Sequence, residues 1–261
     1  MRFGVCAGVD KAPLLAEAGY DYIELAVGGD LVPDEDEAAW GAKRPAIEAL
    51  PLPVESFNSF VRKGRIVGPD ADFDWLERYV RSALSRAAQV GGKIIVFGSG
   101  GARRVPDGVP RDEAERQILR FLHLCADASE RTGVVVAIEP LNRAESNIIN
   151  SVAEGARLVK LVDRPGVRNL ADSYHMEKDD EPVSAVQEFG EVLAHVHTAD
   201  TERGAPGTGV YDHSAFFREL RAVGYDSRVS IECSWKDLAA EAGPALAHLK
   251  RAWADAGSPD T

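Results

Sequence analysis

The stretch RDEAERQILRFLHLCADASERTGVVVAIE, residues 111–139, shows in one unit the pattern that decides the fold. Apolar side chains recur at helical spacing through residues 111–132 and form one stripe, and Gly133 follows as a helix C-cap. Residues 134–138 are apolar without interruption, as in a strand that is buried on both faces. Glu139 follows at once. The stretch therefore predicts a helix that leads into a buried parallel strand with a carboxylate at its end.

The same alternation of helix and apolar strand repeats along the chain. Eight short runs are almost continuously apolar, at residues 3–7, 22–27, 54–57, 94–97, 134–138, 167–171, 193–197 and 229–232. Segments with helical periodicity follow them, at residues 11–18, 34–50, 72–89, 111–132, 152–161, 182–188, 212–223 and 237–255. Eight strands that alternate with eight helices predict a parallel sheet.

The most economical arrangement of this pattern is a single α/β domain. We predict a (β/α)8 TIM barrel over residues 1–256, followed by a frayed tail at residues 257–261. The alternative is an open doubly wound sheet. The first unit contains no Gly-x-Gly-x-x-Gly segment, which disfavours that alternative.

Charge and composition exclude several classes of protein. The chain has 42 acidic and 30 basic side chains, so its net charge is −12, whereas nucleic-acid binding needs clustered Lys and Arg. No run approaches the ~18 apolar residues of a membrane span, and the N-terminus reaches Asp10 before a signal-peptide core can form. Three scattered cysteines indicate reduced thiols. We therefore expect a cytoplasmic protein without nucleic-acid or membrane partners.

Polar residues stand at the ends of the last four predicted strands, as Glu139, Asp172, His197 and Glu232. They are 33, 25 and 35 residues apart, each about one strand–helix unit. The carboxyl ends of barrel strands meet at one rim, so these side chains should converge there. A single acid at such a place is more often a helix cap or an ion-pair partner, but three carboxylates would repel one another unless a cation lay between them. The set predicts a site for a divalent ion such as Mn²⁺, Mg²⁺, Co²⁺ or Zn²⁺.

The residues around these four positions form ordered motifs. They are Glu139-x-x-Asn142-Arg143-x-Glu145, Asp172-x-x-His175-Met176, His195-x-His197 and Arg203-x-x-Pro206-Gly207-x-Gly209. With these motifs in this order, the chain resembles the sugar isomerase/epimerase superfamily of xylose-isomerase-like barrels. It is most similar to the branch of ketose 3-epimerases of the tagatose and allulose type. The resemblance extends over nearly the whole chain and is most specific from Glu139 to Glu232.

This resemblance implies a role for each matching residue. Glu139, Asp172, His197 and Glu232 would bind one divalent metal ion, with Mn²⁺ favoured over Co²⁺, Mg²⁺ and Zn²⁺. Glu139 and Glu232 would also face opposite sides of the reactive substrate carbon and exchange its proton. Barrels of this kind are often dimers or tetramers, so a homo-oligomer is expected.

The resemblance also implies contacts with the substrate. His175 and Arg203 would hydrogen-bond substrate oxygens near the carbonyl, and Glu145 would help to seat the sugar. Each has a simpler interpretation from the sequence alone. Arg203 would be a surface cation, His175 a helix cap, and Glu145 an ion-pair partner of Arg143.

The chemistry that these residues imply is proton transfer next to a carbonyl group. A divalent cation stabilises the enediolate that forms when a carboxylate removes the proton, and a second carboxylate returns a proton from the other face. This predicts a metal-dependent epimerase or isomerase of a ketose, sugar or sugar phosphate, whose partner is a small carbohydrate. The alternatives are a lyase on the same scaffold, such as a keto-polyol dehydratase or a subunit that cleaves 3-keto C-glycosides, an apurinic endonuclease-like enzyme, and a non-catalytic sugar-binding barrel. The acidic charge and the small number of histidines, six in all, disfavour the endonuclease.

A second group of candidate residues follows the fourth predicted strand, in the sequence FGSGGARRVP at residues 97–106. Its small residues would let backbone N–H groups face an anion, and its arginines would complete a phosphate site made by Ser99, Gly100, Arg103 and Arg104. The alternative is a tight loop with two solvated arginines.

The first half of the chain also contributes to the predicted rim. Four residues are expected there and would shape specificity, namely Cys6, Glu24, Glu55 and Asn58. Trp235 follows Glu232 closely and would form a wall of the site.

Overall fold

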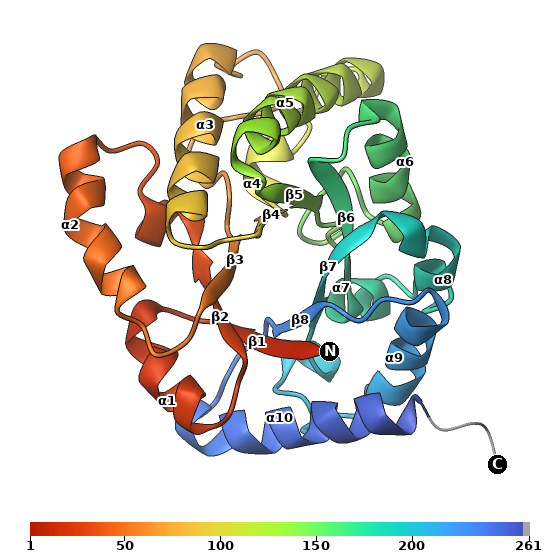
Figure 1. The fold of residues 1–261 in the computed structure, drawn as a ribbon. Coiled ribbons are helices and arrows are strands. Elements are labelled where there is room, and N and C mark those ends of the chain that lie inside the picture. Colours follow the sequence, from red (N-terminus) through yellow and green to blue (C-terminus); the bar gives the residue numbers. More distant parts are fainter. Residues whose placement is uncertain (258–261) are drawn as a thin grey trace.

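The computed structural model describes residues 1–257 and shows a closed barrel of eight parallel strands surrounded by helices (Figure 1). Each strand pairs with the next in sequence, and β8 pairs with β1 to close the ring. The strands are β1 (Arg2–Cys6), β2 (Tyr22–Ala26), β3 (Val54–Asn58), β4 (Ile94–Phe97), β5 (Val135–Ile138), β6 (Val167–Asp172), β7 (Leu193–Thr198) and β8 (Arg228–Ile231). The predicted α/β TIM barrel is confirmed.

The helices cover the outside of the barrel (Figure 1). Those that correspond to predicted helices are α1 (Ala12–Glu17), α2 (Glu37–Glu48), α3 (Phe73–Gln89), α5 (Arg111–Thr132), α6 (Val152–Val162), α8 (Ala185–Phe189), α9 (His213–Ala222) and α10 (Leu238–Asp255). Shorter turns of helix lie in the loops, as η1 (Val9–Lys11), η2 (Val27–Leu31), α4 (Gly100–Arg103), α7 (Ser173–Lys178), η3 (Gly190–Val192) and η4 (Thr201–Arg203). These short elements have no counterpart in the sequence pattern, because one or two turns are too few to show a period.

Side chains at the helix ends explain where several helices begin and stop. Asp72 before α3, Ser151 before α6 and Asp237 before α10 each accept a backbone N–H of the first turn. Helix α5 ends at Gly133, whose φ of 73° is left-handed and whose N–H donates to the Ser129 carbonyl at 2.7 Å. The predicted C-cap at Gly133 is confirmed.

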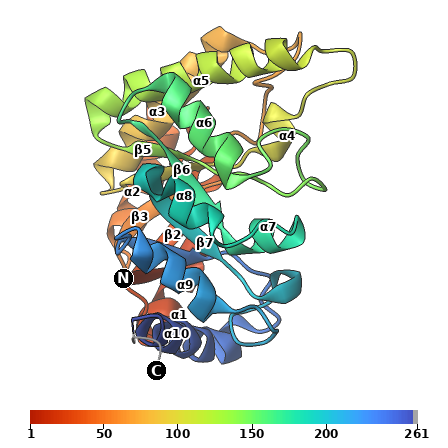
Figure 2. The same ribbon diagram turned by 90° about the vertical axis from the view of Figure 1, so that its right-hand side faces the viewer.

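The two ends of the barrel differ in chemistry. At the N-terminal end, Glu55 near the start of β3 pairs with Arg2 of β1 and with Arg228 of β8. The expectation that Glu55 lies at the catalytic rim is wrong, because it stands near the beginning of its strand. The C-terminal ends of the strands form the opposite rim, which the short helices α4 and α7 mark in the side view (Figure 2).

Two further predictions concern membrane-spanning helices and the C-terminal tail. None of the helices within residues 1–257 combines the length and the apolar character that a membrane span needs. Of the predicted tail, Gly257 donates its N–H to the Ala254 carbonyl at 3.0 Å, and residues 258–261 lie outside the described part of the chain.

Candidate active site

The four predicted metal ligands lie together at the C-terminal rim. Glu139 follows β5, Asp172 ends β6, His197 lies in β7 and Glu232 follows β8. The first three are almost fully buried, and the side chain of Glu232 is 26% exposed. His197 Nδ1 lies 2.9 Å from Glu139 Oε1 and 3.7 Å from Glu232 Oε2. Four consecutive strands therefore bring the expected carboxylates and imidazole to one place.

One set of candidate ligand atoms at this rim contains the imidazole of His175, in α7, in place of that of His197. Glu139, Asp172, His175 and Glu232 each offer a ligand atom, and these atoms lie within 4.8 Å of one another. Asp172 Oδ2 and His175 Nε2 are buried 3.7 Å apart, and neither has a hydrogen-bond partner within the described residues. Buried polar atoms are rarely left unpaired, and these carboxylate oxygens, with His197 Nδ1 beside Glu139, suit a divalent cation. The residues present therefore fit a divalent metal ion.

Glu24 of β2 holds His197 from the side opposite the carboxylates. It is fully buried, and its Oε1 lies 3.0 Å from His197 Nε2. Its Oε2 lies 2.8 Å from His195 Nε2 and accepts the hydroxyls of Ser56 and Ser230 at 2.6 and 2.7 Å. A hydrogen on His197 Nε2, which this contact favours, leaves the Nδ1 lone pair free to bind a metal. Glu24 was expected to shape specificity at the rim, but it lies inside the barrel and orients His197.

The two candidate acid–base glutamates have pKa values that shift in opposite directions. Burial raises the pKa of Glu139, and the charge of Glu232 adds to the rise. Burial also acts on Glu232, but His197 and Arg203 outweigh it and lower the pKa of Glu232 to about 2. Glu139 therefore takes up a proton more readily than Glu232.

The residue after β4 makes room for one of these glutamates. A Cβ atom on Gly98 would lie 2.2 Å from Glu139 Oε2, far inside contact distance. Gly98, the first glycine of the FGSGG sequence, is thus required by the position of the Glu139 carboxylate.

The structure does not form the phosphate site expected after β4. Arg103 is fully buried, and its guanidinium donates to the carbonyl oxygens of Phe97, Glu139 and Ile149 at 3.0, 2.9 and 3.2 Å. Burial lowers the pKa of Arg103 to about 10. Arg103 is therefore neither an anion ligand nor a solvated cation, because it ties the loops after β4 and β5 together. Arg104 is exposed and does not line the rim cavity described below.

Asn142, in the motif that begins at Glu139, connects two other predicted site residues, although the sequence pattern assigned it no role. Asn142 Nδ2 lies 2.9 Å from His175 Nδ1 and donates to Glu145 Oε1 at 3.2 Å. This contact leaves His175 Nε2 facing Asp172. The expected ion pair between Glu145 and Arg143 does not form, because Arg143 pairs with Asp179 instead.

Arg203 bridges two of the predicted site residues. Its Nη1 lies 3.0 Å from Glu145 Oε1, and its Nη2 lies 2.8 Å from Glu232 Oε2. Its guanidinium also lies over the Tyr174 ring, 4.8 Å from the centroid. The backbone φ of Arg203 is 59°, a conformation that is uncommon for residues other than glycine and is often found at functional sites. Arg203 is therefore held over the site and is not a free surface cation.

Asp200 fixes the loop that presents Arg203. Its carboxylate accepts the backbone N–H groups of Gly207 and Tyr211 at 2.7 and 3.0 Å. Gly207 has a φ of 88°, and a Cβ atom on Gly209 would lie 2.4 Å from Asp200 Oδ1. The two glycines of the motif after Arg203 are therefore needed for the turn around Asp200.

A cavity of about 540 Å³ lies at this rim, and we call it the rim cavity. Asp172 and His197 are not among its lining residues. Its volume lies in the ~300–1,000 Å³ range that is common for small-molecule sites. The predicted residues that line it are Asn58, Ser99, Gly100, Glu139, Glu145, His175, Arg203 and Glu232. Cys6 lies beside it, within 4.8 Å of ligand atoms of His197 and Glu232. Trp235, expected to form a wall, is not among the lining residues.

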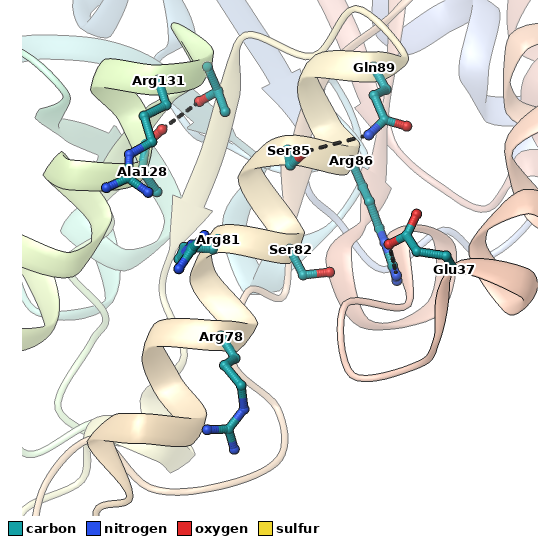
Figure 3. Close-up of a pocket in the computed structure, with 10 residues that line it drawn as sticks. Glu37, Arg78, Arg81, Ser82, Ser85, Arg86, Gln89, Ala128 and Arg131 are labelled. Atoms are coloured by element: carbon teal, nitrogen blue, oxygen red, sulfur yellow. Dashed lines mark hydrogen bonds and ion pairs between the residues drawn. The ribbon is translucent and has the colours of Figure 1, made fainter.

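A larger cavity, of about 710 Å³, lies outside the barrel over α3 (Figure 3). Arginine, serine and glutamine side chains line it, and its one carboxylate, Glu37, pairs with Arg86. It contains no histidine and no pair of carboxylates. The rim cavity is therefore the candidate active site.

Known proteins resemble this chain over most of its length. Residues 12–252 match a family model described as a xylose isomerase-like TIM barrel. The chain is 30% identical over 239 residues to the 3-dehydro-D-guloside 4-epimerase of Escherichia coli (strain K12), with 86% of each chain covered. It is 26% identical to the L-ribulose 3-epimerase of Methylomonas sp. (strain DH-1), in an alignment that covers 94% of this chain and 92% of that relative. The crystal structure of apo 3-keto-D-glucoside 4-epimerase from E. coli matches with a TM-score of 0.81 at 28% identity, covering 96% of this chain and 99% of that chain.

The chain belongs to the xylose isomerase-like TIM barrel family. The resemblance inferred from its motifs is thereby confirmed. Relatives that match most of its length are named sugar epimerases, which confirms the prediction of an enzyme of the isomerase or epimerase class.

Proposed function

We propose that this enzyme inverts a carbon next to the carbonyl group of a keto sugar, with Glu139 and Glu232 as the two groups that transfer the proton. The observation that carries the proposal is the placement of these glutamates. They follow β5 and β8, line one cavity, and have pKa values shifted in opposite directions. Titratable pairs whose environments separate their pKa values are typical of acid–base catalysis.

The ion that we propose for this site is bound by Glu139, Asp172, His197 and Glu232, with His175 beside them. When bound, a divalent cation polarises the carbonyl group and stabilises the negative charge of an enediolate. Three carboxylates with one imidazole favour Mn²⁺, and Co²⁺, Mg²⁺ and Zn²⁺ are the ions to compare with it.

The other residues of the rim cavity bind and orient the sugar in this proposal. Arg203 and His175 carry N–H groups for substrate oxygens, and Glu145 accepts a sugar hydroxyl. Glu232 is ionised at neutral pH and is suited to remove a proton. Glu139, whose pKa is raised, is suited to deliver one to the opposite face. In the reverse reaction the two glutamates exchange these roles.

Proton exchange in heavy water tests this function directly. The metal-loaded protein is incubated in D₂O with 3-keto glycosides and with free ketoses, and the sugars are analysed by mass spectrometry and NMR. We expect one deuterium at the inverted carbon and no other change of mass. Loss of water or of the aglycone would instead indicate a lyase, and a metal-loaded protein that exchanges no substrate proton would contradict the proposal.

A further inference from the structure

A second cavity, of about 520 Å³, lies next to the rim cavity. It is lined by Ala26, the last residue of β2, and by the segment after it, whereas Asn58, the last residue of β3, lines the rim cavity. Ala26 and Asn58 are paired across the two strands, so both cavities lie at the same end of the barrel. Arg62 lines both of them and is exposed. We call the second one the outer cavity.

The wall of the outer cavity is held in a defined shape. Its segment contains the turn η2 (Val27–Leu31), followed by Val32 with a φ of 42°. A β-branched residue in that conformation is strained, and the surrounding structure must hold it. Asp30 Oδ2 accepts the Ala26 N–H at 2.9 Å and closes the turn.

A buried arginine supplies most of this support. Arg86 of α3 donates to the carbonyl oxygens of Leu31, Val32 and Glu35 and pairs with Glu37 at 2.8 Å. Figure 3 shows Arg86 extending from α3 toward Glu37. Only 3% of Arg86 is exposed, so this arginine acts as an internal anchor for the segment. The outer cavity is therefore a pre-formed feature of the rim.

The lining of the outer cavity suits a ring with an apolar face and a polar edge. Apolar groups come from Ala26, Val32, Pro33 and Tyr79, and charged groups come from Asp34, Glu35, Arg62 and Lys63. Gly28 and Gly29 are open to the cavity, since a Cβ atom on either would have no other atom within 4 Å. Pyranose and aryl rings both combine a flat apolar face with polar edge groups.

We propose that the outer cavity binds a ring-sized substituent on the sugar, so that the substrate is a glycoside with a second ring and not a free ketose. The inference rests on the proposed function, because the sugar that reacts occupies the rim cavity. Arg62 lies between the two parts of such a substrate and contacts the link between them.

Binding of unreactive glycosides tests the outer cavity without requiring turnover. Dissociation constants of the metal-loaded protein are measured for methyl glucoside, 4-nitrophenyl glucoside and a glucosyl disaccharide. The wild-type chain should bind at least one of the two-ring ligands about tenfold more tightly than methyl glucoside, the effect of burying roughly one ring face. Which of them gains affinity shows whether the second ring is aryl or glycosyl.

A variant that fills the outer cavity then shows whether the second ring binds there. Gly28→Leu, with Gly29→Leu as a second version, should reduce the gain from the second ring to about twofold or less. Gly41→Leu is the matched control, because Gly41 also has no atom within 4 Å of a Cβ but lies on α2 and lines neither cavity. This control should keep the full gain.

The outcomes separate this inference from the proposed function. A gain that Gly28→Leu or Gly29→Leu removes and Gly41→Leu keeps supports the outer cavity, whether or not the sugar proton exchanges. Equal affinity for one-ring and two-ring ligands, no binding of either, or a gain that survives both filling variants overturns it. Absence of proton exchange in heavy water counts against the epimerase chemistry alone.

Discussion

The two halves of the barrel rim contribute different kinds of residue. Strands β5 to β8 end in, or are followed by, Glu139, Asp172 and Glu232, and β7 carries His197. The corresponding positions of β1 to β4 hold small or neutral residues, namely Cys6, Ala26, Asn58 and Gly98. All six histidines of the chain also follow β4, since the first of them is His123.

The second half of the barrel carries the ionisable groups of the site, and the first half determines the shape of the rim. A cation and a mobile proton need several ionisable groups that converge from rigid strand ends, and the second half supplies them. The first half supplies room through Gly98, Gly28 and Gly29, and support through Glu24. Variants of the strand-end glutamates in the second half should therefore impair the chemistry most, whereas variants in the first half should alter the affinity for metal or substrate.

The largest expected effect comes from the two glutamates of the second half. Glu139→Gln and Glu232→Gln keep the shape of the side chain but remove the base, so each should lower turnover by ~10²–10⁴-fold. Each variant should still exchange deuterium into one epimer, and the retained epimer should differ between the two. Metal content is measured in parallel, because an amide binds a cation more weakly. Equal exchange from both epimers in a metal-loaded variant would exclude the two-base arrangement.

Acid should destabilise the folded protein through His213 of the second half. This residue is buried at the start of α9, and its Nδ1 lies 3.1 Å from His248 Nε2. Burial, together with His248, lowers the pKa of His213 to about 4 from an ordinary 6.5. As pH falls from about 6.5 to about 4, the unfolded chain binds this proton first, so the free energy of unfolding falls by up to roughly 3 kcal/mol.

Denaturant unfolding at several pH values checks this contribution. His213→Gln should be less stable than the wild type at pH 7 and should approach it near pH 4. His123→Gln, at an exposed position on α5, serves as the control and should leave the pH dependence as it is. A gap between His213→Gln and wild type that stays constant with pH would rule out the assignment.

Glu24 and Glu55 provide a matched pair within the first half. Glu24→Gln weakens the contact that orients His197, so we expect metal affinity to fall by ~10–100-fold, as is usual for partners of metal-bound histidines. Glu55→Gln removes a carboxylate from the opposite end of the barrel, where it pairs with Arg2 and Arg228, and should leave metal affinity unchanged. Metal titration by calorimetry distinguishes them, and equal losses in the two variants would show that Glu24 has no special role.

The smallest expected effect concerns Arg203, which we expect to bind substrate and not metal. Arg203→Ala should lower kcat/KM by roughly tenfold, the value of a charged hydrogen bond, with metal content unchanged. Arg143→Ala is the control in the same rim region, because Arg143 pairs with Asp179 and is exposed. Wild-type kinetics for Arg203→Ala on a substrate that exchanges its proton would return Arg203 to a structural role.

Much of the fold and of the central site could be predicted from local patterns. The strand at residues 94–97 is found with the predicted bounds, and each of the other strands differs by one residue at one or both ends. The short helix α7 was missed, although it carries His175. Its six residues are too few to show a helical period, so only the packing of the rim defines it.

The sequence by itself determined the barrel and the convergence of Glu139, Asp172, His197 and Glu232, because strand periodicity and the residue that ends each strand are local properties. Only the tertiary structure decided what Glu24, Glu55 and Arg103 do. Glu24 meets His197 across 173 residues of chain, and Arg103 meets the carbonyl of Ile149 across 46. Two buried or strand-borne acids look alike in sequence, but their roles depend on which distant donors the closed barrel brings to each of them.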